Sequence, residues 1–229
     1  VNPRSSRTVP FLSKATGYSL ADIATEVILG KTLKEQGFFS LYPAEKKRHY
    51  VKVPVFSFNK IKGLDAVLSP EMKSTGEAIG YDDKLNRALY KALQAGGTRL
   101  QNYGTVLATI ADRDKQEALE LIRRFYNLGF NIEATSGTAR FLKEHDIRTR
   151  TLKKISEGSD DIPNAVRQGY IAYIINTRDI GRPVQESDGR KIRRAASENN
   201  VTMFTSLDTV RVLLDVLEET TLTISTIDA

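Results

Sequence analysis

Residues 170–175, Tyr-Ile-Ala-Tyr-Ile-Ile, form the most hydrophobic short run of the chain. Apolar residues at successive positions are typical of a strand in a parallel sheet that is covered on both faces. Four other runs of this kind are predicted strands, at residues 105–110, 130–135, 149–152 and 201–204. Each strand is followed by a predicted helix, at residues 115–128, 138–144, 162–168, 189–199 and 207–217. Five strands that alternate with helices predict an α/β fold with a doubly wound, Rossmann-like parallel sheet.

The first hundred residues follow a different pattern. Helices are predicted at residues 20–29 and 83–93, with a strand at residues 51–58 between them. Pro10 and an earlier proline favour an extended conformation at the start of the chain. A loop punctuated by Gly and Pro is expected to run from the strand to Gly80.

A domain boundary is predicted at residues 94–98, Gln-Ala-Gly-Gly-Thr, where small and flexible residues gather. The predicted domains are therefore residues 1–97 and residues 98–229. The formal net charge of the chain is +6, and the basic excess lies in the first of these domains.

Composition excludes several classes of protein. The chain has no cysteine, which excludes disulfides, thiolate metal sites and cysteine nucleophiles. It has only two histidines. No apolar run approaches the roughly 18 residues that a membrane-spanning helix needs, so no membrane association is expected. The cations form no dense stripe interleaved with aromatic residues, which argues against a nucleic-acid partner. A cytoplasmic protein is expected.

Polar residues follow four of the predicted parallel strands, where the carboxyl ends meet at one edge of the sheet. The candidate residues are, in chain order, Lys115, then Thr135, Ser136, Gly137 and Thr138, then Lys154, then Asn176, Thr177 and Arg178. The N–H groups at a helix start, with lysines beside them, suit a phosphate, and an Asn suits ribose hydroxyls. A Thr-Ser-Gly-Thr run is also a common capped turn, and this alternative stays open.

Residues 2–7, Asn-Pro-Arg-Ser-Ser-Arg, combine an amide oxygen with two arginines. An Asn oxygen suits Mg²⁺, and arginines stabilise charge in phosphoryl transfer. The alternative for such a stretch is an ordinary surface loop.

These residues also carry a resemblance. Residues 2–11, Asn-Pro-Arg-Ser-Ser-Arg-Thr-Val-Pro-Phe, resemble the end of the second ATP-grasp unit of the large subunit of carbamoyl-phosphate synthase. Residues 69–77, Ser-Pro-Glu-Met-Lys-Ser-Thr-Gly-Glu, are similar to a later part of the same unit. Residues 134–138, 173–177 and 192–194 resemble its regulatory domain, which has a methylglyoxal-synthase-like fold.

The resemblance implies the C-terminal part of a ligase that makes carbamoyl phosphate for pyrimidine and arginine synthesis. The family uses bicarbonate, ATP with Mg or Mn, and ammonia that a small glutaminase subunit releases from glutamine. Asn2 matches a metal ligand, and Arg4 and Arg7 match arginines at the ATP and phosphate site. The first domain would then be a partial α+β ATP-grasp lobe, inactive by itself and without a bound cofactor. Its expected partner is the rest of the large subunit.

In the family's regulatory domain, Lys115, Thr135, Thr138 and Lys154 match phosphate-binding residues, and Asn176 matches a ribose-binding one. Uridine monophosphate (UMP), inosine monophosphate (IMP) or phosphoribosyl pyrophosphate are therefore the expected effectors. Arg178 stands where the family's pattern has a Thr. The additional positive charge favours phosphoribosyl pyrophosphate as the effector.

Ornithine is not expected to bind. In the family's pattern the ornithine site uses a Glu and a Tyr-Asp-Thr run, but Val53 and Phe204-Thr205-Ser206 stand at these positions. An α-amino group needs a carboxylate partner, and both carboxylates are missing.

Two alternatives stay open. The predicted domain of residues 98–229 can be a structural or oligomerisation module with a vestigial effector site, as in an isozyme dedicated to arginine synthesis. It can also be a methylglyoxal synthase, but the chain lacks the Gly-Asp-Pro type of run that would carry the catalytic Asp.

Overall fold

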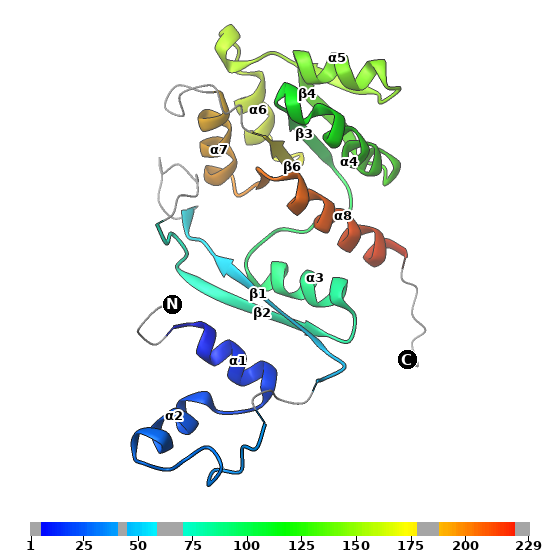
Figure 1. The fold of residues 1–229 in the computed structure, drawn as a ribbon. Coiled ribbons are helices and arrows are strands. Elements are labelled where there is room, and N and C mark those ends of the chain that lie inside the picture. The colour runs from blue at the N-terminus through cyan, green and yellow to red at the C-terminus, as the bar shows by residue number, and fades with distance from the viewer. Residues whose placement is uncertain (1–5, 41–44, 59–70, 178–187, 223–229) are drawn as a thin grey trace. The chain divides into compact units, whose positions relative to one another are not determined.

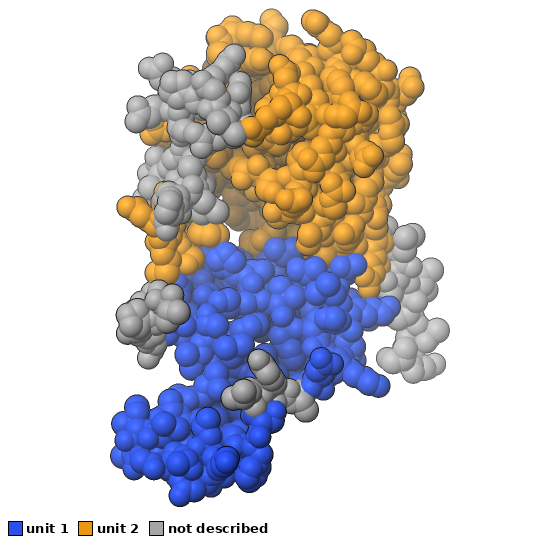
Figure 2. Space-filling view, in the orientation of Figure 1, with its two compact units in different colours: residues 1–55, 76–96 blue, residues 56–75, 97–229 orange. Residues whose placement is uncertain are grey.

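The structure is a computed structural model that describes residues 6–40, 45–58, 71–177 and 188–222. The chain divides into two compact units (Figure 2). The first unit contains residues 1–55 and 76–96, and the second contains residues 56–75 and 97–229. Residues 56–58 and 71–75 are thus assigned to the second unit, although they precede the predicted boundary in sequence.

The described part of the first unit contains helices and a two-stranded antiparallel sheet. Its elements are α1 (Thr8–Thr16), α2 (Leu20–Ile28), β1 (His49–Val55), β2 (Gly76–Asp82) and α3 (Leu85–Ala95) (Figure 1). β1 pairs with β2 along the whole length of both strands, from His49 opposite Asp82 to Val55 opposite Gly76. Ala88 and Ala92 of α3 are fully buried, whereas α1 and α2 bury no residue.

Gly80 allows α3 to lie directly on β2. It is a buried residue in the strand, and a Cβ at this position would overlap the backbone of Ala88 and Ala92. Helix and strand therefore approach so closely that only a glycine fits.

Two expectations for the first unit were wrong. Residues 8–16 form a helix rather than an extended segment, because Pro10 is the third helical residue, where an N–H has no partner within the helix. Residues 76–80 form a strand rather than a loop, because pairing with β1 outweighs their weak local preference. Pro54 was predicted to occupy an edge or a bulge, and it lies opposite Glu77 in a two-stranded sheet, where each strand is an edge.

The second unit is the predicted α/β fold. Its strands are β3 (Thr105–Thr109), β4 (Asn131–Thr135), β5 (Thr149–Leu152), β6 (Ile171–Asn176) and β7 (Thr202–Phe204). All pairings are parallel, in the order β5-β4-β3-β6-β7. The helices between and after them are α4 (Lys115–Asn127), α5 (Ser136–Glu144), α6 (Asp161–Arg167), α7 (Asp188–Glu198) and α8 (Leu207–Leu222) (Figure 1).

Helices cover both faces of this sheet. Val106 and Ala108 of β3 pack in a core with buried residues of α4, α5 and α8. Leu107, which points the other way, packs with buried residues of α6 and α7. All six residues of β6 are buried, as predicted for a strand covered on both faces. The doubly wound parallel sheet is confirmed.

Strand order locates the binding edge. The chain runs outward from β3 to β4 and β5, then returns to place β6 on the other side of β3. Ligands of open parallel sheets bind where the order reverses in this way, beyond the carboxyl ends of the strands. In this unit that place lies between β3 and β6.

Candidate anion-binding site

Side-chain hydrogen bonds join the carboxyl ends of β3 and β6. Thr109 Oγ1, at the end of β3, donates to Asn176 Oδ1 at 3.0 Å. Thr177 Oγ1 accepts the backbone N–H of Ala111 at 2.8 Å. The backbone N–H of Thr177 donates to the Thr109 carbonyl at 3.1 Å. Asn176 and Thr177 therefore fix the spacing of the two strand ends.

Helix α5 begins directly where β4 ends. Thr135 is its N-cap and Ser136 its first residue, two residues earlier than predicted. Thr138 is 2% exposed, and its Oγ1 accepts the backbone N–H of Ile110 at 3.2 Å. Thr135 Oγ1 lies 3.5 Å from Thr138 Oγ1. The first turn of α5 is thus held against the segment that follows β3, and its unpaired N–H groups point out of the helix start.

Lys115 brings a cation to the same turn of α5. It is the first residue of α4 and follows a short 3-10 turn, η2 (Asp112–Asp114). Its Nζ donates to the Gly137 carbonyl at 3.3 Å and lies 2.6 Å from Asp112 Oδ1. The Lys115 side chain is 17% exposed, whereas that of Asp112 is 94% exposed. The ammonium is therefore held between the helix start and a carboxylate in solvent.

Lys154 comes from the far side of the sheet, after the edge strand β5. It is half-buried, and its backbone N–H donates to Glu157 Oε2 at 3.2 Å. The hydrogen bond and charge of Lys115 lower the pKa of the Asp112 carboxyl, and the positive charge of Lys154 adds to this effect.

Asn176 is already engaged at both ends of its side chain. It is 4% exposed, and besides accepting from Thr109 it donates through Nδ2 to the Gly189 carbonyl at 3.4 Å. A ribose hydroxyl at Asn176 would have to use the second N–H or the second lone pair of this buried amide. Asn176 is therefore placed at the strand ends as predicted, but its amide joins β6 to β3 and to the first turn of α7.

Arg193 is a buried cation near Asn176 for which the sequence pattern predicts no role. It lies in α7 and is 7% exposed. A Cβ on Gly189 would sit 3.3 Å from Arg193 Nη1 and 3.3 Å from Asn176 Nδ2, so the missing side chain makes room for both. The burial of Arg193 could have been predicted from its position beside Ile192 and Ala196, on the apolar face of the predicted helix.

Asn2, Arg4 and Arg178 lie outside the described residues. Arg7 belongs to the first unit, where its Nε lies 4.0 Å from Glu77 Oε1. In the described ranges, no group of three or more His, Asp and Glu side chains is placed to hold a metal ion. No helix in those ranges combines the length and hydropathy of a membrane span.

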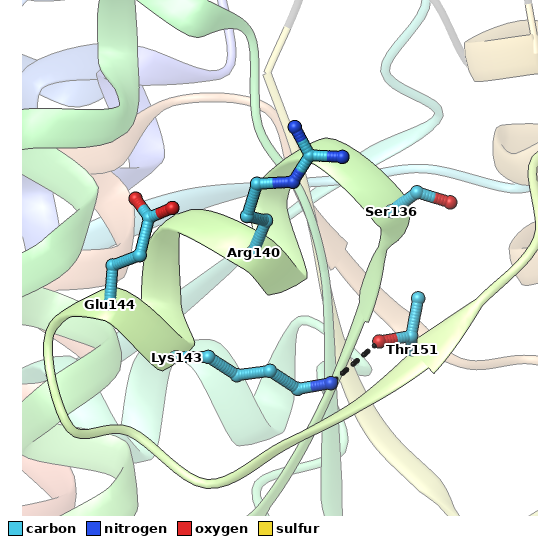
Figure 3. Close-up of a pocket in the computed structure, with 5 residues that line it drawn as sticks. All are labelled: Ser136, Arg140, Lys143, Glu144 and Thr151. Atoms are coloured by element: carbon cyan, nitrogen blue, oxygen red, sulfur yellow. Dashed lines mark hydrogen bonds between the residues drawn. The ribbon is translucent and has the colours of Figure 1, made fainter.

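An open groove of about 510 Å³ runs along α5 from its first residue. It is lined by Ser136, Arg140, Lys143, Glu144 and Thr151 (Figure 3). Lys143 reaches across it and donates from Nζ to Thr151 Oγ1 at 3.0 Å, whereas Arg140 points away from that bond (Figure 3). Ser136 is the residue that the groove shares with the predicted anion site.

Residues 117–205 match the family model described as the MGS-like domain, a range that runs from α4 to just beyond β7. Among solved structures, the chain is similar to methylglyoxal synthase from Elizabethkingia anophelis NUHP1. The sequence identity is 18% and the TM-score 0.44, and the match covers 50% of this chain and 79% of that chain. The second unit is thus an α/β unit with a five-stranded parallel sheet and an MGS-like fold.

Proposed function

We propose that the second unit binds a phosphorylated small molecule at the carboxyl ends of β3, β4 and β5. The observation that carries the proposal is the meeting of Lys115 with the first turn of α5. Lys115 Nζ donates to the Gly137 carbonyl at 3.3 Å, and Lys154 adds its positive charge from the end of β5. Groups that follow the ends of β3 and β4 thus meet at one helix start.

The chemistry of this place suits a phosphate. The first turn of α5 offers backbone N–H groups that have no partner within the helix, and the helix dipole favours a negative charge there. Lys115 and Lys154 supply two positive charges, beside the carboxylates of Asp112 and Glu157. Charge-assisted hydrogen bonds from such groups are about twice as strong as neutral ones.

The role that fits best is regulation of a carbamoyl-phosphate synthase. The motifs in residues 2–11 and 69–77 support this parent enzyme, and the MGS-like domain is compatible with its regulatory part. In that setting, UMP, IMP or phosphoribosyl pyrophosphate is the effector. The rest of the large subunit and a glutaminase subunit are the partners, and the cytoplasm is the location.

The ATP chemistry of the parent enzyme would lie with the first unit. Arg7 is the one predicted ATP-site residue in the described ranges, and its guanidinium faces Glu77 together with Lys52, whose Nζ is 3.4 Å from Glu77 Oε1. These contacts form a salt-bridge network around Glu77. ATP, the metal ion at Asn2 and the role of Arg4 remain part of the proposal for the whole enzyme, and we expect the 229-residue chain by itself to be inactive.

Two other functions compete with this one. A structural or oligomerisation module would keep the fold and ignore nucleotides. A methylglyoxal synthase would convert its substrate, and its fold is compatible with the second unit. The absence of a Gly-Asp-Pro type of run from the sequence favours a binding unit over this enzyme.

The test is a thermal-shift titration of the 229-residue chain with UMP, IMP, phosphoribosyl pyrophosphate and ornithine. A ligand at about 100 times its Kd stabilises a protein by about 2.7 kcal/mol, which raises Tm by several degrees. We expect a shift with at least one phosphorylated ligand and none with ornithine. No shift with any of the three phosphorylated ligands, for a folded chain, would favour the structural module.

Lys154→Ala locates the site. Loss of a charge-assisted contact to phosphate should weaken binding by about 10- to 150-fold. Lys153→Ala is the matched control, because it removes the same charge from the neighbouring exposed residue. Equal weakening in both variants would mean that only the overall charge matters and that the phosphate binds elsewhere.

A further inference from the structure

The ion pair between Asp112 and Lys115 occupies the place where an anion would contact the lysine. Lys115 Nζ lies 2.6 Å from Asp112 Oδ1, the shorter of its two polar contacts, and 3.3 Å from the Gly137 carbonyl. The carboxylate that pairs with Lys115 belongs to Asp112 in η2, which immediately precedes α4. A ligand phosphate at the start of α5 and Asp112 would therefore compete for one ammonium.

The two partners of this ion pair are exposed to very different degrees. The Lys115 side chain is 17% exposed and its ammonium is also held by α5, whereas the Asp112 side chain is 94% exposed. An aspartate in solvent can turn away by rotation about its own side-chain bonds. Ion pairs of this exposed kind contribute little to stability. The ion pair with Asp112 thus offsets the positive charge of Lys115 at the site, and it adds little to the stability of the fold.

The positive charge of Lys154 also acts on the Asp112 carboxylate. This charge, together with the hydrogen bond from Lys115, holds the pKa of Asp112 below the usual range. Asp112 therefore stays ionised and is attracted by both cations that a phosphate would use. A phosphate dianion is attracted to the two cations more strongly than a singly charged anion, and it is also repelled more strongly by Asp112.

We propose that Asp112 is a built-in counter-ion that competes with the ligand phosphate for Lys115 and so lowers the affinity of the site for anions. This inference rests on the proposed phosphate site. Asp112 acts on the ligand through Lys115 and does not touch the phosphate when the site is occupied. Binding would exchange the Asp112–Lys115 contact for a phosphate–Lys115 contact.

The test compares Asp112→Asn with wild type in the full 229-residue chain, by calorimetric titration with inorganic phosphate and with acetate at pH 8. Removal of one like charge near the ligand should tighten phosphate binding roughly fivefold. It should tighten acetate binding by less, because Asp112 repels a singly charged anion less strongly than a dianion. Asp114→Asn is the matched control: it removes the same charge two residues away, where Asp114 pairs with Arg113 at 3.2 Å. We expect that control to stay within twofold of wild type.

The outcomes separate this inference from the proposed function. If wild type binds phosphate and Asp112→Asn binds it equally or more weakly, Asp112 positions Lys115 rather than competing for it, and the inference is wrong while the phosphate site stands. If neither protein binds phosphate or a nucleotide, both proposals are wrong. If only Asp112→Asn binds, both are supported.

A second readout does not depend on affinity. In wild type labelled with ¹³C at the aspartate carboxyls, saturating phosphate should raise the pKa of Asp112 toward its ordinary range, because Lys115 leaves it. An unchanged, low pKa in the saturated protein would show that Lys115 stays with Asp112 and would overturn the inference.

Discussion

Thr138 Oγ1 accepts the backbone N–H of Ile110 at 3.2 Å, which joins the first turn of α5 to the segment after β3. Both residues are at least nine-tenths buried. The bond connects two of the strand ends that surround the candidate site, so the position of the helix start depends on it.

Thr138→Val tests this bond. Valine has nearly the same shape but leaves the buried Ile110 N–H without its acceptor, which should lower the free energy of unfolding by about 1–3 kcal/mol. Urea unfolding followed by circular dichroism measures the change. Thr151→Val, at an exposed residue of β5, should change stability by about 0.5 kcal/mol or less. Equal effects at the two positions would contradict a special role for the Thr138 bond.

Arg150→Ala tests how the edge strand is held. Arg150 Nη1 donates to Glu133 Oε1 at 3.0 Å, and Tyr170 OH donates to Glu133 Oε2 at 3.2 Å. The Glu133 side chain is 6% exposed, so loss of Arg150 leaves a buried carboxylate with one donor. We expect a loss of about 1–2 kcal/mol, reduced by the solvent around Arg150.

Arg148→Ala is the control for that variant. Arg148 is exposed, and within the described part of the chain it has neither a hydrogen bond nor an ion pair. Its truncation should leave the urea midpoint nearly unchanged. A midpoint shift as large as that of Arg150→Ala would show that β5 responds to charge in general and not to the Glu133 contact.

Asp82 should give the first unit a distinct acid response. A hydrogen bond from Lys91 Nζ at 2.7 Å and the backbone N–H of Lys84 lower its pKa to about 2. Because the folded pKa is depressed, its contribution is fully present above the unfolded value of about 3.9 and is lost as the pH falls through about 2. The stability of Asp82→Asn should therefore fall less than that of wild type between pH 4 and pH 2.

Chemical unfolding at several pH values measures this difference. Asp83→Asn is the control, because it removes the neighbouring carboxylate, which pairs with Arg48 at 3.3 Å, and leaves Asp82 in place. It should keep the wild-type loss between pH 4 and pH 2. Parallel pH curves for wild type and Asp82→Asn would argue that Lys91 does not hold Asp82 in solution.

Gly80→Ala should disrupt the packing of α3 on β2. A methyl group there would overlap the backbone of Ala88 and Ala92, and relief requires the helix to move. Overpacking of this kind costs about 3 kcal/mol. Gly76→Ala, whose Cβ would meet Val55 Cβ at an ordinary 3.6 Å, should be tolerated. Thermal unfolding of the two variants distinguishes them, and a Tm for Gly80→Ala equal to that of Gly76→Ala would contradict the close approach.

Local patterns were sufficient to predict the second unit because each of its elements carries its own signal. A continuous apolar run marks β6, and Gly129 follows the periodic pattern of α4. The first unit was harder to predict. The strand β2 contains Gly76, Gly80 and two acidic residues, and it exists because β1 supplies the pairing. Weak local preference cannot reveal a strand whose stability comes from a partner distant in sequence.

The sequence by itself determined the alternation of strands and helices, the edge of the sheet where polar residues gather, and the candidate cations Lys115 and Lys154. These follow from periodicity and from the rule that parallel strands end together. Only the tertiary structure decided that Asn176 is engaged on both sides, that Arg193 is buried beside it, and that Asp112 holds Lys115. Whether a polar group is available to a ligand depends on distances of a few ångströms between side chains of different elements, and no local pattern encodes those distances.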